Sequence, residues 1–254
     1  MTGRQRAVGL LVLALAAWQI VGQSFSPGRQ EAGPRRIISI VPSVTEILFA
    51  IGAGPHVVAV STYDHTPREV ERLPRVGALL DPDVERMLSL RPDLVVTYGS
   101  QGDLSKQLAR AGIPMFPYRH GDLAQLMRTI RDLGRRVGSP AGAESLANQL
   151  ERRFAAIRAR VQGRPRPRTL LVIEREPLTL RNVHASAGIG FMHEILEIAG
   201  AHDALADVRR ESLQLSTETI LARAPEAIVE LHYTGELTGA QLETERNKIG
   251  RAHV

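Results

Sequence analysis

The chain has 254 residues, of which 43% are hydrophobic and 23% are charged. It can therefore bury one large core or two smaller ones, and it is neither disordered nor collagen-like. The net charge of +5 comes from arginines interspersed with acidic residues, a pattern that disfavours a nucleic-acid partner. The sequence contains no cysteine, which excludes disulfides, thiolate nucleophiles, cysteine-ligated metals and a lipid-modified cysteine anchor within it.

Residues 1–23 are interpreted as a signal peptide or an uncleaved N-terminal anchor. Arg4 and Arg6 precede an uncharged stretch at 7–22 that is shorter than the about 20 apolar residues needed to span a bilayer. No clear cleavage site with small residues follows, so the segment can be either a cleaved signal peptide or an uncleaved anchor. Residues 24–34, rich in Gly, Pro, Gln and Ser, are predicted to be a linker. We therefore expect an exported, periplasmic protein, tethered if the segment is not cleaved.

Short apolar runs alternate with helical patterns along residues 35–139. The first strand is expected at 36–41 and the second at 56–60, with a helix between them, and the same cycle repeats to the end of this segment. This alternation predicts an α/β lobe in which helices cover a parallel sheet.

The first predicted helix carries a start signal and a stop signal. Ser43 and Glu46 fit a Ser-x-x-Glu capping box, which places the start of the helix at Ser43. Gly52 or Gly54 can end the helix in a left-handed conformation.

Residues 140–163 are predicted to form one long helix. Apolar residues follow one another at spacings of three and four from Leu146 to Val161, and no proline interrupts the segment 141–162. Such a helix would be about 33 Å long and would join two lobes. An ordinary surface helix of a single domain is the alternative.

A second α/β series is expected over 164–248. It ends abruptly, and residues 249–254 look like a translated sequencing adapter, so we expect this second lobe to be incomplete. The expected elements are a strand at 169–174, a loop at 175–187, helices at 190–200 and 216–224, and a strand at 226–233.

Two segments 133 residues apart share one helix-to-strand pattern with identical spacing. We therefore expect the two lobes to be related folds, each with one carboxylate in the first turn of a helix. There a carboxylate also complements the helix dipole, which contributes about 0.3–1 kcal/mol. The matched residues are Glu85, Leu88 and Pro92 in one segment and Glu218, Leu221 and Pro225 in the other.

Over about residues 35–234, the order and spacing of the segments resemble those of the helical-backbone periplasmic binding proteins of ABC importers. These proteins deliver vitamin B12, ferric siderophores or haem. The nearest pattern is that of the cobalamin-binding members. The segments that carry the resemblance are RIISIVPSVTEILFAIGAG, VSTYDHTP, DVERMLSLRPDLVV, the linking helix and STETILARAPEAIVE.

The resemblance implies two Rossmann-like lobes joined by one rigid helix, with a ligand cleft between them. It implies a monomer without catalytic activity or intrinsic cofactor, which captures a corrinoid or another small metal complex. The implied partner is a permease dimer with its ATPase, whose arginines pair with Glu85 and Glu218.

Ligand contacts are expected from the loops after the strands, because ligands of open α/β sheets bind beyond the carboxyl ends of the strands. By the resemblance, Tyr63 matches the tyrosine that contacts cobalamin in the cobalamin-binding members. Its flat ring suits the face of a macrocycle. Where the cobalamin protein has tryptophans, this chain has Leu79 or Leu80 and Leu213, so another corrinoid, a ferric siderophore or haem stays open. The predicted ligand-binding residues are Pro42, Ser43, Tyr63, Leu80, Tyr98 and His184.

Haem would need an axial ligand, whereas a bare metal ion is not expected. The sequence has no HExxH motif, no histidine pair at zinc spacing and no calcium-type aspartate cluster. Catalytic triads are set by geometry rather than by spacing, so an exported hydrolase that uses the interlobe cleft is the alternative function. The candidate axial ligands are His65, His184 and His232, beside Tyr63, Tyr98 and Tyr233.

Overall fold

The computed structural model describes residues 33–176, 179 and 181–231 of the chain. The predicted leader, the linker up to residue 32, His232, Tyr233 and the predicted tail at 249–254 lie outside the described residues. From Pro34 onward the described residues belong to one structural unit. Within this part of the chain, no helix combines the length and the hydropathy that crossing a membrane requires.

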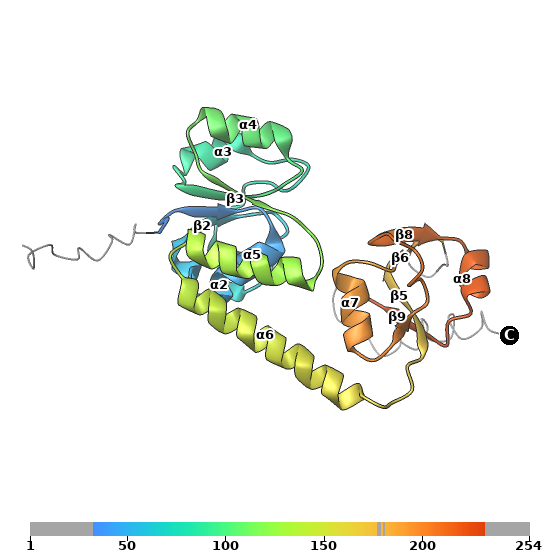
Figure 1. The fold of residues 1–254 in the computed structure, drawn as a ribbon. Coiled ribbons are helices and arrows are strands. Elements are labelled where there is room, and N and C mark those ends of the chain that lie inside the picture. The colour runs from blue at the N-terminus through green and yellow to red at the C-terminus, as the bar shows by residue number, and fades with distance from the viewer. Residues whose placement is uncertain (1–32, 177–178, 180, 232–254) are drawn as a thin grey trace, which may run out of the picture. The chain divides into compact units, whose positions relative to one another are not determined.

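The first half of the described chain forms a parallel sheet, as its alternating pattern predicts (Figure 1). The strand order is β2-β1-β3-β4, and all neighbouring pairs run parallel. The adjacent residues Ile37 and Ile38 of β1 point to opposite faces, and both are fully buried. Helices must therefore cover both faces of the sheet. The strands are β1 (Ile37–Ser39), β2 (Val57–Val60), β3 (Leu94–Tyr98) and β4 (Met115–Tyr118).

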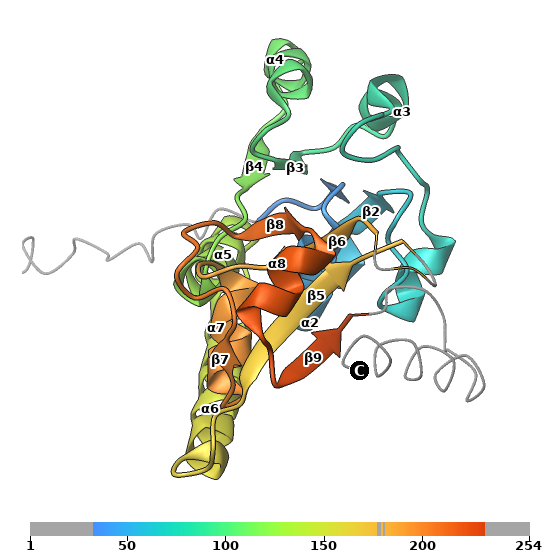
Figure 2. The ribbon, with the colours of Figure 1, turned by 90° about the vertical axis from the view of Figure 1, so that its right-hand side faces the viewer.

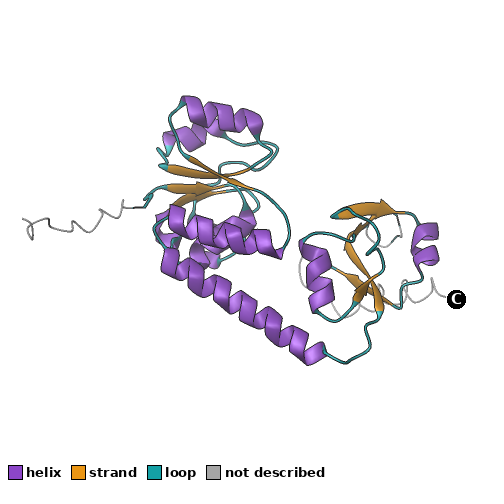
Figure 3. Ribbon diagram, viewed as in Figure 1, coloured by secondary structure: helices purple, strands orange, loops and turns teal. Residues whose placement is uncertain are grey.

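Two layers of helices provide this cover (Figures 2 and 3). Helices α2 and α5 pack on the face of Ile37, and helices α3 and α4 pack on the face of Ile38. Two short 3-10 helices lie in the connections around β2. The bounds are α2 (Pro42–Ala50), α3 (Val84–Ser89), α4 (Gly102–Arg110), α5 (Leu123–Arg136), η1 (Gly54–His56) and η2 (Arg68–Arg72).

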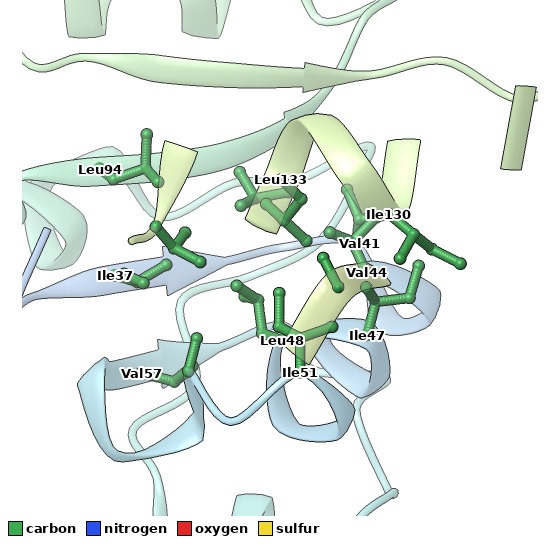
Figure 4. Packing of buried hydrophobic residues seen from close by; sticks show 14 of the residues in the cluster. Ile37, Val41, Val44, Ile47, Leu48, Ile51, Val57, Leu94, Ile130 and Leu133 are labelled. Carbon is green, nitrogen blue, oxygen red and sulfur yellow. The ribbon is translucent and has the colours of Figure 1, made fainter. Parts of the chain in front are cut away.

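The larger core lies between β1, α2 and α5 (Figure 4). Val44 and Leu48 of α2 are four residues apart and meet Ile130 and Leu133 of α5, and all four side chains have no exposed surface. Burying such a side chain contributes about 1.5–3 kcal/mol relative to leaving it in water. The spacing of apolar residues in the sequence thus selects the face of each helix that packs on the sheet.

Helix α2 begins at Pro42, so the predicted capping box is wrong. The N-cap is Val41, and Ser43 lies inside the first turn without capping the helix. Proline suits the first helical position because its φ is already helical and its missing N–H would lack an intrahelical acceptor. The predicted end is confirmed, because Gly52 follows the helix with a left-handed φ of +87°.

The predicted long helix is present as α6 (Pro140–Val161), an unbroken run of 22 residues. Its first half packs on the core of the first sheet through Ala143 and Ala147, which are buried. Residues 155–160 near its other end are all exposed. Only the N-terminal part of α6 is therefore embedded in the first half of the chain.

The crossing of α5 and α6 depends on a glycine. A Cβ at Gly134 of α5 would lie 2.2 Å from the Cβ of Ala143 and 3.0 Å from the carbonyl oxygen of Ser139. We expect Gly134→Ala to lower the free energy of unfolding by about 1–3 kcal/mol, because overpacking outweighs the about 1 kcal/mol gained in helix propensity. Urea denaturation followed by circular dichroism measures this change.

The matched control is Gly102→Ala in α4, where an added Cβ would meet nothing within 4 Å. This control should leave the stability unchanged or raise it. A Gly134→Ala variant as stable as the control would contradict the close packing of α5 and α6.

The second half of the described chain forms a mixed sheet around β5. Strand β5 pairs in parallel with β7 and β9 and antiparallel with β6, which pairs antiparallel with β8. Core residues of β5 contact α7 on one face and α8 on the other. The elements are β5 (Arg168–Glu174), β6 (Val183–Ser186), α7 (Phe191–Ile198), β7 (His202–Asp203), β8 (Ser212–Leu215), α8 (Thr217–Arg223) and β9 (Ala227–Glu230).

The prediction of a loop over 175–187 is wrong at its end, where β6 lies. Val183 and Ala185 are buried, while His184 between them is exposed. Such a short alternation is weak evidence for a strand, and the backbone pairing with β5 and β8 that forms β6 comes from distant residues.

The repeat predicted from the sequence is confirmed over the matched segments. Helix α3 leads into β3, which pairs in parallel with the first strand of its sheet, and α8 leads into β9, which pairs in the same way with β5. Before the matched prolines, Arg91 and Ala224 both adopt a left-handed φ, of 47° and 43°. The two helix-to-strand units therefore share topology and local backbone conformation.

Candidate functional site

The carboxyl ends of the parallel strands bring most of the predicted contact residues to one edge of the first sheet. Pro42 and Ser43 follow β1, Tyr63 follows β2, and Tyr98 is the last residue of β3. Because β1, β2 and β3 are parallel, these positions share one edge. Leu80 belongs to the connection between β2 and α3.

Two of these residues expose large apolar surfaces. Tyr63 is 68% exposed and Leu80 is 93% exposed, and the neighbouring Leu79 is 40% exposed. A carbonyl in this loop is held in place, since Gln101 Nε2 donates a 2.9 Å hydrogen bond to the oxygen of Leu79. Apolar side chains on an anchored backbone indicate a contact surface rather than a packing defect.

The loop that carries Tyr63 is fixed by a buried carboxylate. Asp64 Oδ2 accepts hydrogen bonds of 2.8 Å from the N–H and 2.6 Å from the hydroxyl of Ser61. The guanidinium of Arg75 donates to the carbonyls of Ser61 and Asp64, at 3.0 and 2.6 Å. Asp64 itself is fully buried. The turn that carries the exposed Tyr63 is therefore held in place by hydrogen bonds.

A cluster of aromatic side chains lies beside this surface. The rings of Tyr98 and Tyr118 meet edge to face, with centroids 6.2 Å apart and an interplanar angle of 72°. The hydroxyl of Tyr118 lies 3.2 Å from His120 Nδ1 and is also hydrogen-bonded with Ser43. Ser43, which does not cap its helix, thus contributes its hydroxyl to this cluster.

Burial favours the neutral form of both phenols. It raises the pKa of Tyr98 above the ordinary value of 10.0, and the neighbouring Tyr118 and Asp64 raise it further. Burial also raises the pKa of Tyr118, and this outweighs the lowering by its hydrogen bond with Ser43. Near neutral pH Tyr98 can therefore donate a hydrogen bond to a ligand, whereas the hydroxyl of Tyr118 already interacts with His120 and Ser43.

The cluster opens into a cavity of about 530 Å³. Apolar side chains make up most of the exposed lining, beside a polar and partly charged side. The polar and charged residues are Ser43, Glu46, Tyr98, Tyr118, Arg119, His120, Asp122 and Gln125. A cavity with a few convergent polar groups and apolar walls is typical of a small-molecule site. The apolar lining includes Ile47, Ala50, Leu126, Ile130, Leu146, Leu150, Phe191 and Met192.

A wider basin of about 880 Å³ lies along the end of α6 and along α7. Arg166 and Glu197 of its lining form an ion pair with each other. None of the predicted contact residues lines this basin, and its open, charged walls suit a small organic ligand less well than the smaller cavity does.

Sequence reasoning missed Tyr118 and His120. Tyr118 is the last residue of β4, so the rule that pointed to Tyr98 at the end of β3 would also have found it. The available signal was the apolar run that ends in this tyrosine.

Of the predicted contact residues, only Ser43 and Tyr98 line the cavity. Pro42, Tyr63, Leu80 and His184 do not. His184 stands in β6, opposite Gln214 of β8, and it is exposed. Leu213 packs against the core of the second sheet instead of standing free. In the described part of the chain, no group of three or more acidic or histidine side chains could hold a metal ion.

The matched carboxylates occupy the same position in α3 and α8. Glu85 and Glu218 are each the second residue of their helix, and both are exposed. Hydrogen bonds from a backbone N–H and from the side chain of Ser216 lower the pKa of Glu218. Each helix thus presents one carboxylate to solvent.

Comparison with known proteins identifies the family. Residues 37–241 match the family described as periplasmic binding protein. The chain belongs to this family. A relative from Salmonella typhimurium, named vitamin B12-binding protein, is 30% identical over 234 residues, which are 91% of this chain and 81% of the relative.

Solved periplasmic binding proteins share the fold. A haem-binding protein from Pseudomonas aeruginosa is 26% identical, with a TM-score of 0.72 over 86% of this chain and 79% of the other. The vitamin B12-binding protein BtuF of Vibrio cholerae has a TM-score of 0.67 over 84% and 85%, at 23% identity. The names of these periplasmic binding proteins describe solute binding and give the hydrolase alternative no support.

Proposed function

We propose that this protein is the extracytoplasmic substrate-binding protein of an ABC importer and that it captures a corrinoid such as cobalamin. Membership of the periplasmic binding protein family and the vitamin B12-binding relative support this role. The observation that carries the choice of ligand is the exposed apolar surface of Tyr63 and Leu80 on an anchored sheet edge. The role is binding and delivery, without a catalytic step.

A large, flat macrocycle fits this surface because it buries apolar area without requiring a deep pocket. Tyr63 would stack on the macrocycle face, while Leu80 would cover its margin. Ser43 and Tyr98 offer hydroxyl groups that can bind the amide side chains at the periphery of a corrin, beside the ring of Pro42. His184 would contribute from the second sheet.

Haem is the second candidate, favoured by the haem-binding relative from Pseudomonas aeruginosa and by the exposure of Tyr63 and His65. Either side chain could act as an axial ligand to ferric iron. A ferric siderophore would need neither stacking nor axial ligation by the protein.

Spectroscopic titration tests the proposal. The purified protein is titrated with cyanocobalamin, haemin and a ferric siderophore, and visible spectra and melting curves are recorded. Cyanocobalamin should raise the stability by about 2.7 kcal/mol at a hundredfold excess over Kd. If haemin shows a shifted Soret band and cobalamin gives no response, haem is the ligand instead of a corrinoid. No response to any of the three would contradict the proposed ligand class.

Delivery would require docking to a permease dimer with its ATPase. Glu85 and Glu218 are proposed as the docking carboxylates, one from each half, acting from a monomeric binding protein in the periplasm. Their exposure and their identical helix positions support this role.

A further inference from the structure

Two exposed leucines occupy the same place in the two matched helices. Leu88 of α3 is 39% exposed, and Leu221 of α8 is 54% exposed. Each is the fifth residue of its helix and follows the matched glutamate by three positions. The residue before each leucine, Met87 or Ile220, packs into the core of its own half. Both helices are therefore turned the same way on their sheets.

The caps hold the two helices in the same register. Asp83 accepts a 2.9 Å hydrogen bond from the N–H of Arg86, and Ser216 accepts a 3.2 Å bond from the N–H of Thr219. In a helix, residues three apart are neighbours on one face. Each half of the protein thus presents a carboxylate with an aliphatic side chain one turn further along, which we call the Glu-Leu epitope.

We propose that Leu88 and Leu221 are the apolar anchors of the permease contact. This inference rests on the proposed function. It adds an apolar part to the docking surface, beside the two carboxylates. Two copies of one epitope on a single chain suit a partner that carries two copies of one complementary site, as a two-fold symmetric permease dimer does. Each site on the partner would place a cationic side chain beside an apolar depression.

The two parts of the epitope contribute differently. An exposed carboxylate steers the encounter through charge, and its contribution falls as salt screens it. A leucine that enters an apolar depression contributes through buried area, which salt does not screen. Salt dependence therefore separates the role of the leucines from that of the glutamates.

The test measures binding to the permease complex from the same cell, reconstituted in nanodiscs of phosphatidylcholine and phosphatidylglycerol. Leu88→Gln and Leu221→Gln remove the apolar group while keeping chain length and helix propensity. Each should weaken binding by about tenfold, and the double variant by about a hundredfold, at low and at high salt alike. The control is Ile157→Gln in α6, since Ile157 is 39% exposed, as Leu88 is, and lies outside both epitopes.

Melting curves and ligand titration check that the variants fold, and Leu88→Ala with Leu221→Ala serves as a second pair if the glutamine variants melt early. The inference is overturned if the leucine variants bind like the Ile157→Gln control while Glu85→Gln with Glu218→Gln weakens binding. It is also overturned if the leucine substitutions weaken binding to nanodiscs without permease as much as binding to nanodiscs with permease. Lipid would then be the partner. If the wild-type protein does not bind the permease at all, the proposed delivery role fails together with the inference.

Discussion

Replacing Tyr63 by alanine is expected to weaken corrinoid binding by about 30-fold to 100-fold. Tyr63 is 68% exposed, so a macrocycle that stacks on its ring buries apolar area that is otherwise in water. Such burial of an aromatic side chain contributes about 2–3 kcal/mol. The turn below it is held by Ser61, Asp64 and Arg75, so the loop should keep its conformation in the variant. Titration of cyanocobalamin by visible absorbance gives the change in Kd.

Phenylalanine at the same position separates stacking from metal ligation. Tyr63→Phe keeps the ring and should keep nearly all the affinity for a corrinoid. If haem is the ligand and the phenol oxygen binds its iron, the same variant should lose the charge-transfer band of the ferric complex. Thr62→Ala, an exposed neighbour in the same loop, is the matched control. An unchanged Kd for Tyr63→Ala with every macrocycle would remove this edge of the sheet as the stacking surface.

The double substitution Glu85→Gln with Glu218→Gln is expected to weaken binding to the permease by about tenfold to a hundredfold. Both carboxylates are exposed at the second position of their helices, and neither lines the cavity beside Tyr98. A charge at an interface acts mainly on the rate of association and on orientation. The affinity for the transported ligand should therefore stay unchanged while uptake falls. Ligand-stimulated ATP hydrolysis in nanodiscs measures the coupling.

A control with the same change of net charge is Glu69→Gln with Glu71→Gln, because both residues are exposed in η2. This control should support wild-type uptake. Equal uptake by the Glu85 and Glu218 double variant would refute the docking role, and a parallel loss in both double variants would point to net charge instead of position.

The elements with a strong local signal could be predicted from the sequence. The apolar spacing of α6 gave its bounds to within two residues, since an unbroken helix depends mainly on its own residues. The repeat around Glu85 and Glu218 was also predictable, because identical spacing of a helix, a proline and a strand leaves few alternative folds.

The elements that depend on distant pairing could not be predicted in the same way. Strands β6 and β8 are short, and their hydrogen bonds join residues about 30 positions apart, as in the pair Val183 and Leu215. Propensity carries little information about such pairing. The same limit applies to Ser43, whose hydroxyl meets Tyr118 only because β1 and β4 belong to one sheet. The sequence therefore identified candidate residues by their positions after the predicted strands. Which side chains contact each other became known only from the structure.

The unequal burial along α6 has a mechanical consequence. Its N-terminal turns are clamped by Ala143 and Ala147, while residues 155–160 lie in water and keep their helical form mainly through the propensity of alanine and arginine. The work needed to unwind a turn therefore decreases as far as Arg160, before Val161 packs against Gly200, where an added Cβ would lie 2.8 Å from the Cβ of Val161. Torsion arriving from the second sheet would be absorbed in these last turns, so the core around Leu48 and Ile130 would stay undisturbed.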